Sequence, residues 1–436
     1  MKRMVFLLVI LLCGNAVHAQ KMIDIYKKGP VKLVADKSYG AGNNWEALFN
    51  HYYDTLTSMD KVQNRNKKII VAPDGSVFMS HKNRHEIWKF GPDGNLIKKF
   101  GAKGGKQDQF PMIPNIQTIV DGKYILTCDA NSRLRLFDFE GKHYKSQTLD
   151  YMTRGFQSLG NGELLAIGMV MWKETEPGTN ITSYRWRNIV VRLNIFSGEE
   201  KILYSMFGPV DMQLKNAESK DKVEMLSVSS PDGKIHLPSG LAFDRPCFSL
   251  LSDGRFLVSN AGTGEVKVFS KEGREVSSFK LDIKPLAITE EDVLQNYKMV
   301  ERNSLKLIDD ANKSERSEEQ KQKIIEQARN ELKNKDRYKD ISNYYPHLPY
   351  FSNILLDDEG NLLVFEYTKN ESNLFNVIAY DNAGTKLATT SFQCDDYDIY
   401  FSGNTFVISK GYVYAVAKLK NAKGMPLRLV KFKMTN

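Results

Sequence analysis

Aromatic and cationic side chains alternate around a long loop in the middle of the chain. Trp172 opens this loop, and the run Tyr184-Arg185-Trp186-Arg187 closes it. Trp rings stack on sugar rings and on cations, and Arg pairs with carboxylates, so Trp172, Arg185 and Trp186 favour a glycan, a peptide or an anionic small molecule as the ligand. The alternative is a β-ribbon whose Trp side chains only pack on a neighbouring unit.

A second aromatic segment, Tyr344-Tyr345-Pro346-His347-Leu348-Pro349-Tyr350, could form the wall of a pocket through Tyr345 and His347. The segment could equally fill space.

A third group of candidate residues is cationic or polar and lies on short loops between strands. If these loops point towards a central channel, the group could converge on a carboxylate. Its members are His81, Arg84, His85, Arg133 and Asn260. Ordinary loop polarity is the alternative.

Short apolar strands that end in Asp-Gly-like turns recur six times. In the first unit, Asp74-Gly75 separates residues 69–72 from 76–79, and Asp93-Gly94 separates 86–90 from 95–100. Each piece has strand length, and the Asp-Gly pairs supply the positive φ of tight turns. The first turn recurs at Gly75, Gly122, Gly162, Gly254, Gly360 and Gly411, and the second at Gly94, Gly141, Gly198, Gly273 and Gly384. Four antiparallel strands per unit are typical of a β-propeller blade.

The last unit is incomplete, because the chain ends after three strands. Near the N-terminus, the strand-like segment Val31–Ala35 stands alone. We therefore expect Val31–Ala35 to pair with Arg428–Phe432 and to close an all-β, six-bladed propeller of four-stranded antiparallel blades without a free edge. A seventh blade would require a degenerate unit within residues 207–247.

The run Asp129-Ala130-Asn131-Ser132-Arg133-Leu134-Arg135-Leu136-Phe137 matches the Asp-x-x-Asn-x-Arg-hydrophobic core of NHL-type repeats, and residues 83–90 and 260–269 match it loosely. The chain thus resembles the six-bladed propellers built from NHL-type repeats, in particular exported bacterial members. The resemblance implies a fold and no particular function.

The same resemblance suggests an alternative function, because some six-bladed propellers are metal-dependent lactonases or lyases that act at the central channel. Carboxylate, amide and imidazole side chains could then hold a metal, and the candidates are His81, Asp129, Asp244, Asn260 and Glu366. No HExxH or GxSxG motif organises them, so we assign no catalytic residue and no metal ligand, and the cofactor stays unknown. Asp129 and Asn131 can instead hydrogen-bond their own loop. We expect a binding protein rather than an enzyme.

The long insertions are expected on one face of the disc. They are the loop at about 171–188 and the connectors 207–247 and 283–351, and they join strands on the same side of a propeller. This face is the predicted binding face. Within 283–351, between blades 4 and 5, Thr289 and Ser317 can each cap a helix. We expect a helical hairpin there, which serves as a lid, a partner surface or a purely structural element.

Residues 1–19 have the layout of a secretory signal peptide, with Lys2 and Arg3 before the apolar run Met4–Leu12 and cleavage after Ala19. Lipid attachment at Cys13 is the rival interpretation. Either way we predict an exported protein, periplasmic or extracellular, whose mature chain forms one domain over 20–436 with no transmembrane segment.

The composition of the 436-residue chain argues against nucleic acid as a partner. Loss of the two basic residues at the N-terminus lowers the net charge from +9 to +7, and no dense block of Lys and Arg occurs. The mature cysteines, Cys128, Cys247 and Cys394, are odd in number, so at least one is unpaired.

Overall fold

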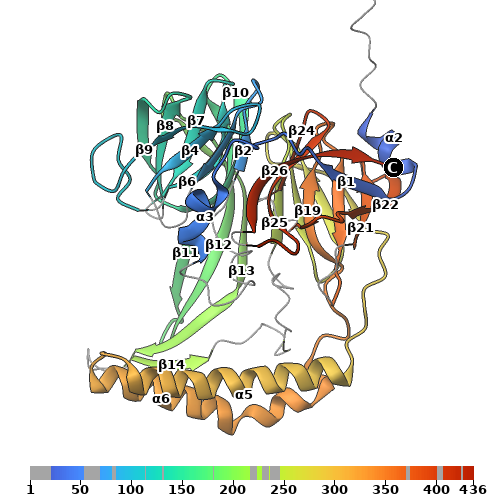
Figure 1. The fold of residues 1–436 in the computed structure, drawn as a ribbon. Helices are drawn as coiled ribbons and strands as arrows, with labels where there is room; N and C mark the ends of the chain where they lie inside the picture. Colours follow the sequence, from blue (N-terminus) through green and yellow to red (C-terminus); the bar gives the residue numbers. More distant parts are fainter. Residues whose placement is uncertain are drawn as a thin grey trace, which may run out of the picture.

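A computed structural model describes residues 21–53, 69–80, 85–112, 114–129, 132–179, 181–216, 223–227, 235, 246–369, 374–399, 406–423 and 426–436. These residues form an all-β, propeller-like fold with few helices (Figure 1). The predicted signal peptide and Cys13 lie outside the described residues. Cys128, Cys247 and Cys394 are all free thiols.

Four of the five sheets are separate and follow the order of the chain. Two short helices near the N-terminus precede them, α2 (Met22–Lys27) and α3 (Trp45–Tyr53). The first sheet contains β2 (Ile69–Val71), β3 (Val77–Ser80), β4 (Ile87–Phe90) and β5 (Leu96–Phe100). The second contains β6 (Asn115–Val120), β7 (Tyr124–Cys128), β8 (Arg133–Asp138) and β9 (His143–Thr148). The third contains β10 (Met152–Gly160), β11 (Glu163–Thr175), β12 (Ile181–Asn194), β13 (Glu200–Asn216) and β14 (Val223–Ser227). The fourth contains β15 (Pro246–Leu250), β16 (Phe256–Asn260), β17 (Glu265–Phe269) and β18 (Glu275–Lys280).

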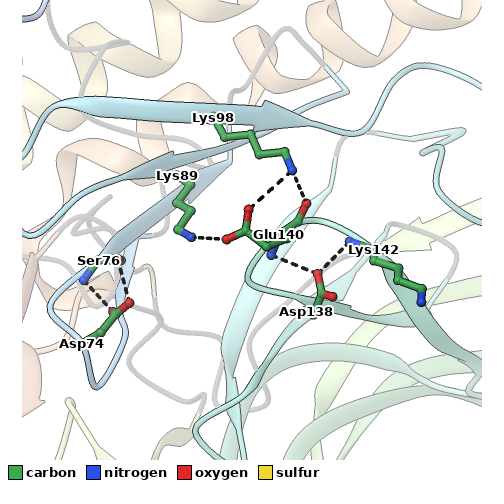
Figure 2. Close-up of polar contacts among 7 residues, drawn as sticks. All are labelled: Asp74, Ser76, Lys89, Lys98, Asp138, Glu140 and Lys142. Atoms are coloured by element: carbon green, nitrogen blue, oxygen red, sulfur yellow. Dashed lines mark hydrogen bonds and ion pairs between the residues drawn. The ribbon is translucent and has the colours of Figure 1, made fainter.

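The predicted Asp-Gly turns are confirmed, since all eleven turn glycines have φ between 65° and 90°. At Gly94 a Cβ would lie 2.6 Å from the backbone nitrogen of Gly40, so only glycine fits. The Asp carboxylates accept hydrogen bonds within their own turns, as Asp138 does from the backbone N–H groups of Glu140 (2.9 Å) and Lys142 (2.8 Å) (Figure 2).

The second turn of one unit also contacts the preceding unit. The Glu140 carboxylate forms an ion pair with Lys89 of β4 (2.7 Å), and the backbone carbonyl of Glu140 accepts a hydrogen bond from Lys98 of β5 (2.7 Å) (Figure 2). The hydrogen bond from Lys89, together with its positive charge, holds the pKa of Glu140 below its ordinary value. The turns therefore connect neighbouring sheets as well as reversing the chain.

The fifth sheet is curled and has nine strands, eight of which come from the C-terminal part of the chain. Its members are β1 (Val31–Ala35), β19 (Phe351–Leu356), β20 (Leu362–Glu366), β21 (Leu374–Tyr380), β22 (Lys386–Gln393), β23 (Tyr397–Asp398), β24 (Phe406–Ser409), β25 (Tyr412–Leu419) and β26 (Leu427–Thr435). β1 pairs antiparallel with β26 as predicted, although the register places Lys32 opposite Thr435 and Ala35 opposite Phe432.

The strand pairing does not give six separate blades. β1 also pairs in parallel with β22, through Val31 opposite Phe392 and Lys32 opposite Gln393. Because β1 is hydrogen-bonded along both of its edges, the last two predicted units merge into one continuous sheet. The alternative of a seventh unit is not seen in the described part of 207–247, where β13 is prolonged to Asn216 and β14 adds a fifth strand to the third sheet.

The predicted helical hairpin is present as α5 (Glu290–Lys313) and α6 (Glu318–Lys333), followed by the 3-10 turns η1 (Lys335–Lys339) and η2 (Ile341–Asn343). Thr289 caps α5 in a reciprocal capping box with Asp292, and Ser317 caps α6 by accepting a hydrogen bond from the backbone of Gln320. The two helices lie side by side, away from most of the strands (Figure 1).

Leu33 of β1 provides a test of the sheet that joins the two ends of the chain. Its side chain is buried in a cluster with Val31, Phe392 and Phe432, whereas Val34 is 51% exposed. Leu33→Ala should lower the free energy of unfolding by about 2–5 kcal/mol, because it leaves a cavity in that cluster. Val34→Ala on the same strand should change it little. Thermal and urea unfolding measure both, and equal effects would contradict the role assigned to β1.

Candidate functional site

The predicted long loop at 171–188 is a three-stranded ribbon rather than an open loop. β11, β12 and β13 continue well past the length of the other strands, and a turn that includes residues 176–179 follows β11. In Figure 1 the ribbon runs from the third sheet towards the helical hairpin. The backbone of this segment is therefore the β-ribbon of the alternative interpretation. The two faces of the ribbon carry different side chains and are described in turn.

The register places Trp172 directly opposite Arg185, and Arg187 directly opposite Phe207. Residues paired in this way share one face of a sheet. The Trp172 and Phe207 rings lie 5.7 Å apart at 64°, and the guanidinium carbons of Arg185 and Arg187 lie 4.7 Å and 5.6 Å from the Phe207 ring centre. We call Trp172, Arg185, Arg187 and Phe207 the ribbon cluster.

The ribbon cluster is open to solvent and carries positive charge. Trp172 and Phe207 are each 41% exposed. Glu174 forms an ion pair with Arg185 (2.9 Å), whereas Arg187 donates from Nε to the Ser205 hydroxyl and has no carboxylate partner among the described residues. One guanidinium charge of the cluster is thus balanced and the other is not.

Trp186 does not belong to this cluster. It pairs with Met171, so its side chain leaves the opposite face of the ribbon from Trp172 and Arg185. A single ligand on one face of the ribbon cannot stack on both Trp rings.

The return segment 344–350 lies elsewhere. Tyr344 packs with Ile235 and Val293 at the start of α5, and the backbone of Ile235 donates to the Asn343 carbonyl (2.7 Å). Two of the predicted insertions therefore meet at this point. In Figure 1, however, the ribbon points towards the C-terminal end of α5, whereas the return segment follows the opposite end of the hairpin. The structure does not bring Tyr345 and His347 next to the ribbon cluster.

His347 is engaged with its own segment. Its Nδ1 lies 2.9 Å from the Leu348 carbonyl oxygen, its ring meets the Tyr350 ring edge to face at 5.4 Å, and its backbone forms a bridge with Ala287. These contacts fit the structural interpretation of the segment, as filling between the fourth sheet and the nine-stranded sheet.

A cavity of about 310 Å³ separates α5 from the end of β20, and we call it the hairpin cavity. The residues that line it are Asp292, Gln295, Asn296, Met299, Arg302, Leu348, Tyr367 and Lys369. Sequence reasoning missed the site, although the spacing of its α5 residues places them on one helical face and could have indicated it. Their partners, Tyr367 and Lys369, are remote in sequence and gave no signal.

Asp292 and Lys369 form an ion pair across the hairpin cavity. Burial acts to raise the pKa of Asp292, but hydrogen bonds from Lys369 and Thr289 outweigh it and hold that pKa below its ordinary value. Burial, and then the nearby charge of Asp292, raise the pKa of Tyr367. The lining thus holds one acidic side chain, Asp292, and two basic side chains, Arg302 and Lys369.

Only some of the residues predicted to lie on loops near a central channel, or to hold a metal there, are described. His81, Arg84, Asn131 and Asp244 lie outside the described residues. Arg133 begins β8 and is half-buried. The imidazole of His85 lies 2.7 Å from the Phe110 carbonyl oxygen, and Asn260 accepts hydrogen bonds from the backbone of Gly262 and Thr263. His85 and Asn260 therefore stabilise their own loops.

Asp129, a metal-ligand candidate, is committed to a buried ion pair. Its Oδ2 accepts a hydrogen bond from Nη1 of Arg135 at 2.9 Å, its Oδ1 accepts from the backbone of Arg133, and the side chains of the pair are 1% and 0% exposed. The other predicted function of Asp129, a hydrogen bond within its own loop, is the one observed. In the portions of the chain that are described, no group of three or more His, Cys, Asp or Glu side chains could hold a metal ion.

The described helices include none that is both long and apolar enough to cross a membrane. No family model matches the sequence, and no curated protein matches it either.

Solved structures offer distant likenesses to the chain. A member of the duf4221 family from Bacteroides vulgatus is 12% identical, covers 94% of this chain and 100% of its own, and gives a TM-score of 0.47. The Swd1 β-propeller domain of Myceliophteria thermophila is 10% identical over 84% of this chain and 86% of its own, with a TM-score of 0.35. A protein of unknown function from Bacteroides caccae is 10% identical over 81% of this chain and 88% of its own, with a TM-score of 0.34. Likeness of this degree says nothing about function.

The Asp129–Arg135 pair should be structural. Asp129→Ala should lower the free energy of unfolding by about 3–5 kcal/mol, because it leaves the Arg135 charge buried without a partner. The double variant Asp129→Leu with Arg135→Met should recover much of this loss, since it removes both charges. Glu319→Ala, which breaks an exposed ion pair with Lys323, serves as the control and should leave urea unfolding almost unchanged. A double variant as unstable as Asp129→Ala would contradict this account.

Proposed function

We propose that this is an exported binding protein that takes an acidic glycan on the ribbon cluster. The observation that carries the proposal is the contact of two guanidinium groups and one indole ring with the exposed ring of Phe207. An aromatic surface offers a partner for the apolar face of a sugar ring, and Arg offers paired donors for a carboxylate or sulfate. The unbalanced charge of Arg187 favours an acidic sugar over a neutral one.

The position of the cluster supports a binding role. It lies on a ribbon that extends beyond the core of the third sheet, so a ligand can reach it without displacing buried side chains. Exposed aromatic residues clustered in this way are uncommon on a surface without a partner. No observation on the described residues favours the alternative of a metal-dependent lactonase or lyase.

Export and a six-unit ring complete the proposal. The layout of residues 1–19 supports removal of a signal peptide after Ala19, which would leave a mature protein in the periplasm or outside the cell. In the nine-stranded sheet, β19–β22 and the set β24, β25, β26 and β1 have the strand order of two further four-stranded units, which supports six units. The match at residues 129–137 supports the NHL type. Mass spectrometry of the exported protein tests the first point, since it should begin at Gln20, and a lipid on Cys13 would contradict it.

The two Trp residues of the ribbon provide a matched pair of variants. Trp172→Ala should weaken binding of a uronic-acid oligosaccharide by about 10-fold, or roughly 1.4 kcal/mol, because it removes a ring from the cluster. Trp186→Ala, which removes the same side chain from the opposite face, should leave the affinity unchanged. Calorimetric titration measures both, with a neutral oligosaccharide of the same length as a second control.

Equal losses for the two variants would show that the face of the ribbon does not matter and would overturn the assignment to the ribbon cluster. Equal affinity for the acidic and neutral oligosaccharides would overturn the role given to Arg187.

A further inference from the structure

The hairpin cavity has the lining of a binding site that is separate from the ribbon cluster. Its floor is one face of α5, where Asp292, Gln295, Asn296, Met299 and Arg302 follow each other at helical spacing. At 1.5 Å per residue, Asp292 and Arg302 are roughly 15 Å apart along the helix axis. The cavity is therefore an elongated slot rather than a round pocket.

Charge and polarity divide the slot along its length. At one end, Asp292 is already balanced by Lys369 and by its capping bonds with Thr289. At the other end, Arg302 forms an ion pair with none of the described acidic side chains. The unbalanced positive charge of the slot thus lies at the Arg302 end, where a planar guanidinium can bind a carboxylate through two hydrogen bonds.

The middle of the slot offers two amide side chains, and each nitrogen donates one hydrogen bond to a protein group. Nδ2 of Asn296, which is 5% exposed, donates to the Tyr344 hydroxyl at 3.0 Å, and Nε2 of Gln295 donates to Glu291 at 2.6 Å. Among the described residues no group donates to the oxygen of either amide. The oxygens of Asn296 and Gln295 can therefore accept hydrogen bonds from a ligand that carries N–H groups.

The opposite wall is apolar or aromatic, and Leu348 and Tyr367 form it together with Met299 from the floor. Met fills irregular space and adapts to different side chains. A volume of about 310 Å³ is at the small end of the range for ligand pockets, which is about 300–1,000 Å³. A ligand of this size is a small molecule or a very short chain.

We propose that the hairpin cavity binds a short extended peptide, of about three residues, through its free C-terminal carboxylate. Arg302 binds the carboxylate, the oxygens of Gln295 and Asn296 accept backbone N–H groups, and Met299, Leu348 and Tyr367 contact apolar side chains. An extended peptide of three residues spans about 10 Å, which fits within the roughly 15 Å between Asp292 and Arg302 and leaves the Asp292–Lys369 pair undisturbed. This site does not depend on the proposed glycan site, because no residue is shared between them.

The test uses the whole protein and a pool of ten tripeptides with apolar side chains, each prepared as the free acid and as the C-terminal amide. Calorimetry should show binding of free acids, with the amides at least 10-fold weaker. Arg302→Gln should weaken the free acids about 10-fold and reduce the difference between acid and amide. Lys298→Gln, which removes a positive charge from the same helix outside the slot, should change neither.

A second variant guards against an indirect effect of charge. Met299→Trp should fill the slot and abolish binding of the acids and amides alike, with circular dichroism confirming that the fold is kept. Trp172→Ala should leave peptide binding unchanged, so the outcome here and the outcome for the glycan are independent.

Three results would each overturn the proposal. The first is equal binding of acids and amides, the second is full affinity in Arg302→Gln, and the third is no binding of any of the ten free acids at millimolar concentration.

Discussion

Both backbone edges of β1 are hydrogen-bonded, and the continuity of the largest sheet depends on this. An unpaired strand edge exposes a row of N–H and C=O groups, and β22 and β26 would each have such an edge without β1. The preceding helix strengthens the arrangement, since Tyr26 is buried and donates to Asp357 at 3.2 Å. Burial is the main cause that raises the pKa of Asp357, although the hydrogen bonds it accepts act in the opposite direction. The N-terminal segment is thus built into the core.

The features that follow from local chemistry could be predicted from the sequence. Asp-Gly turns need a positive φ and an acceptor for the next N–H groups, and both requirements are visible in the residue types alone, as at Asp138 and Gly141. The start of α5 was equally clear, because a capping Thr289 followed by acidic residues is a local signal. The pairing of β1 with β26 followed from counting strands, but the contact of β1 with β22 could not, since no residue type marks which second edge a strand will meet.

The ribbon and the hairpin cavity depend on register and on distant packing. A shift of one residue between β11 and β12 would place Trp172 directly opposite Trp186, on the same face, and the sequence of a long connection does not fix that shift. Phe207 lay at the border of a predicted connector, so its place beside Arg185 was not foreseeable. In the hairpin cavity, Asp292 and Lys369 come from segments 77 positions apart, and only the path of the chain through η1 and η2 brings them together.

The adjacency of the two ends of the chain also has a consequence in time. The side chain of Asn436 donates to the carbonyl of Ile25, a contact between residues 411 positions apart. Synthesis at about 5–20 residues per second would separate the appearance of these two ends by roughly 20 to 80 seconds. During that interval the strand that joins β22 to β26 waits without its partners, and the growing chain exposes edges that can pair with other chains. A cell that makes this protein therefore needs either to shield the unfinished chain or to delay its folding until the last strand has emerged.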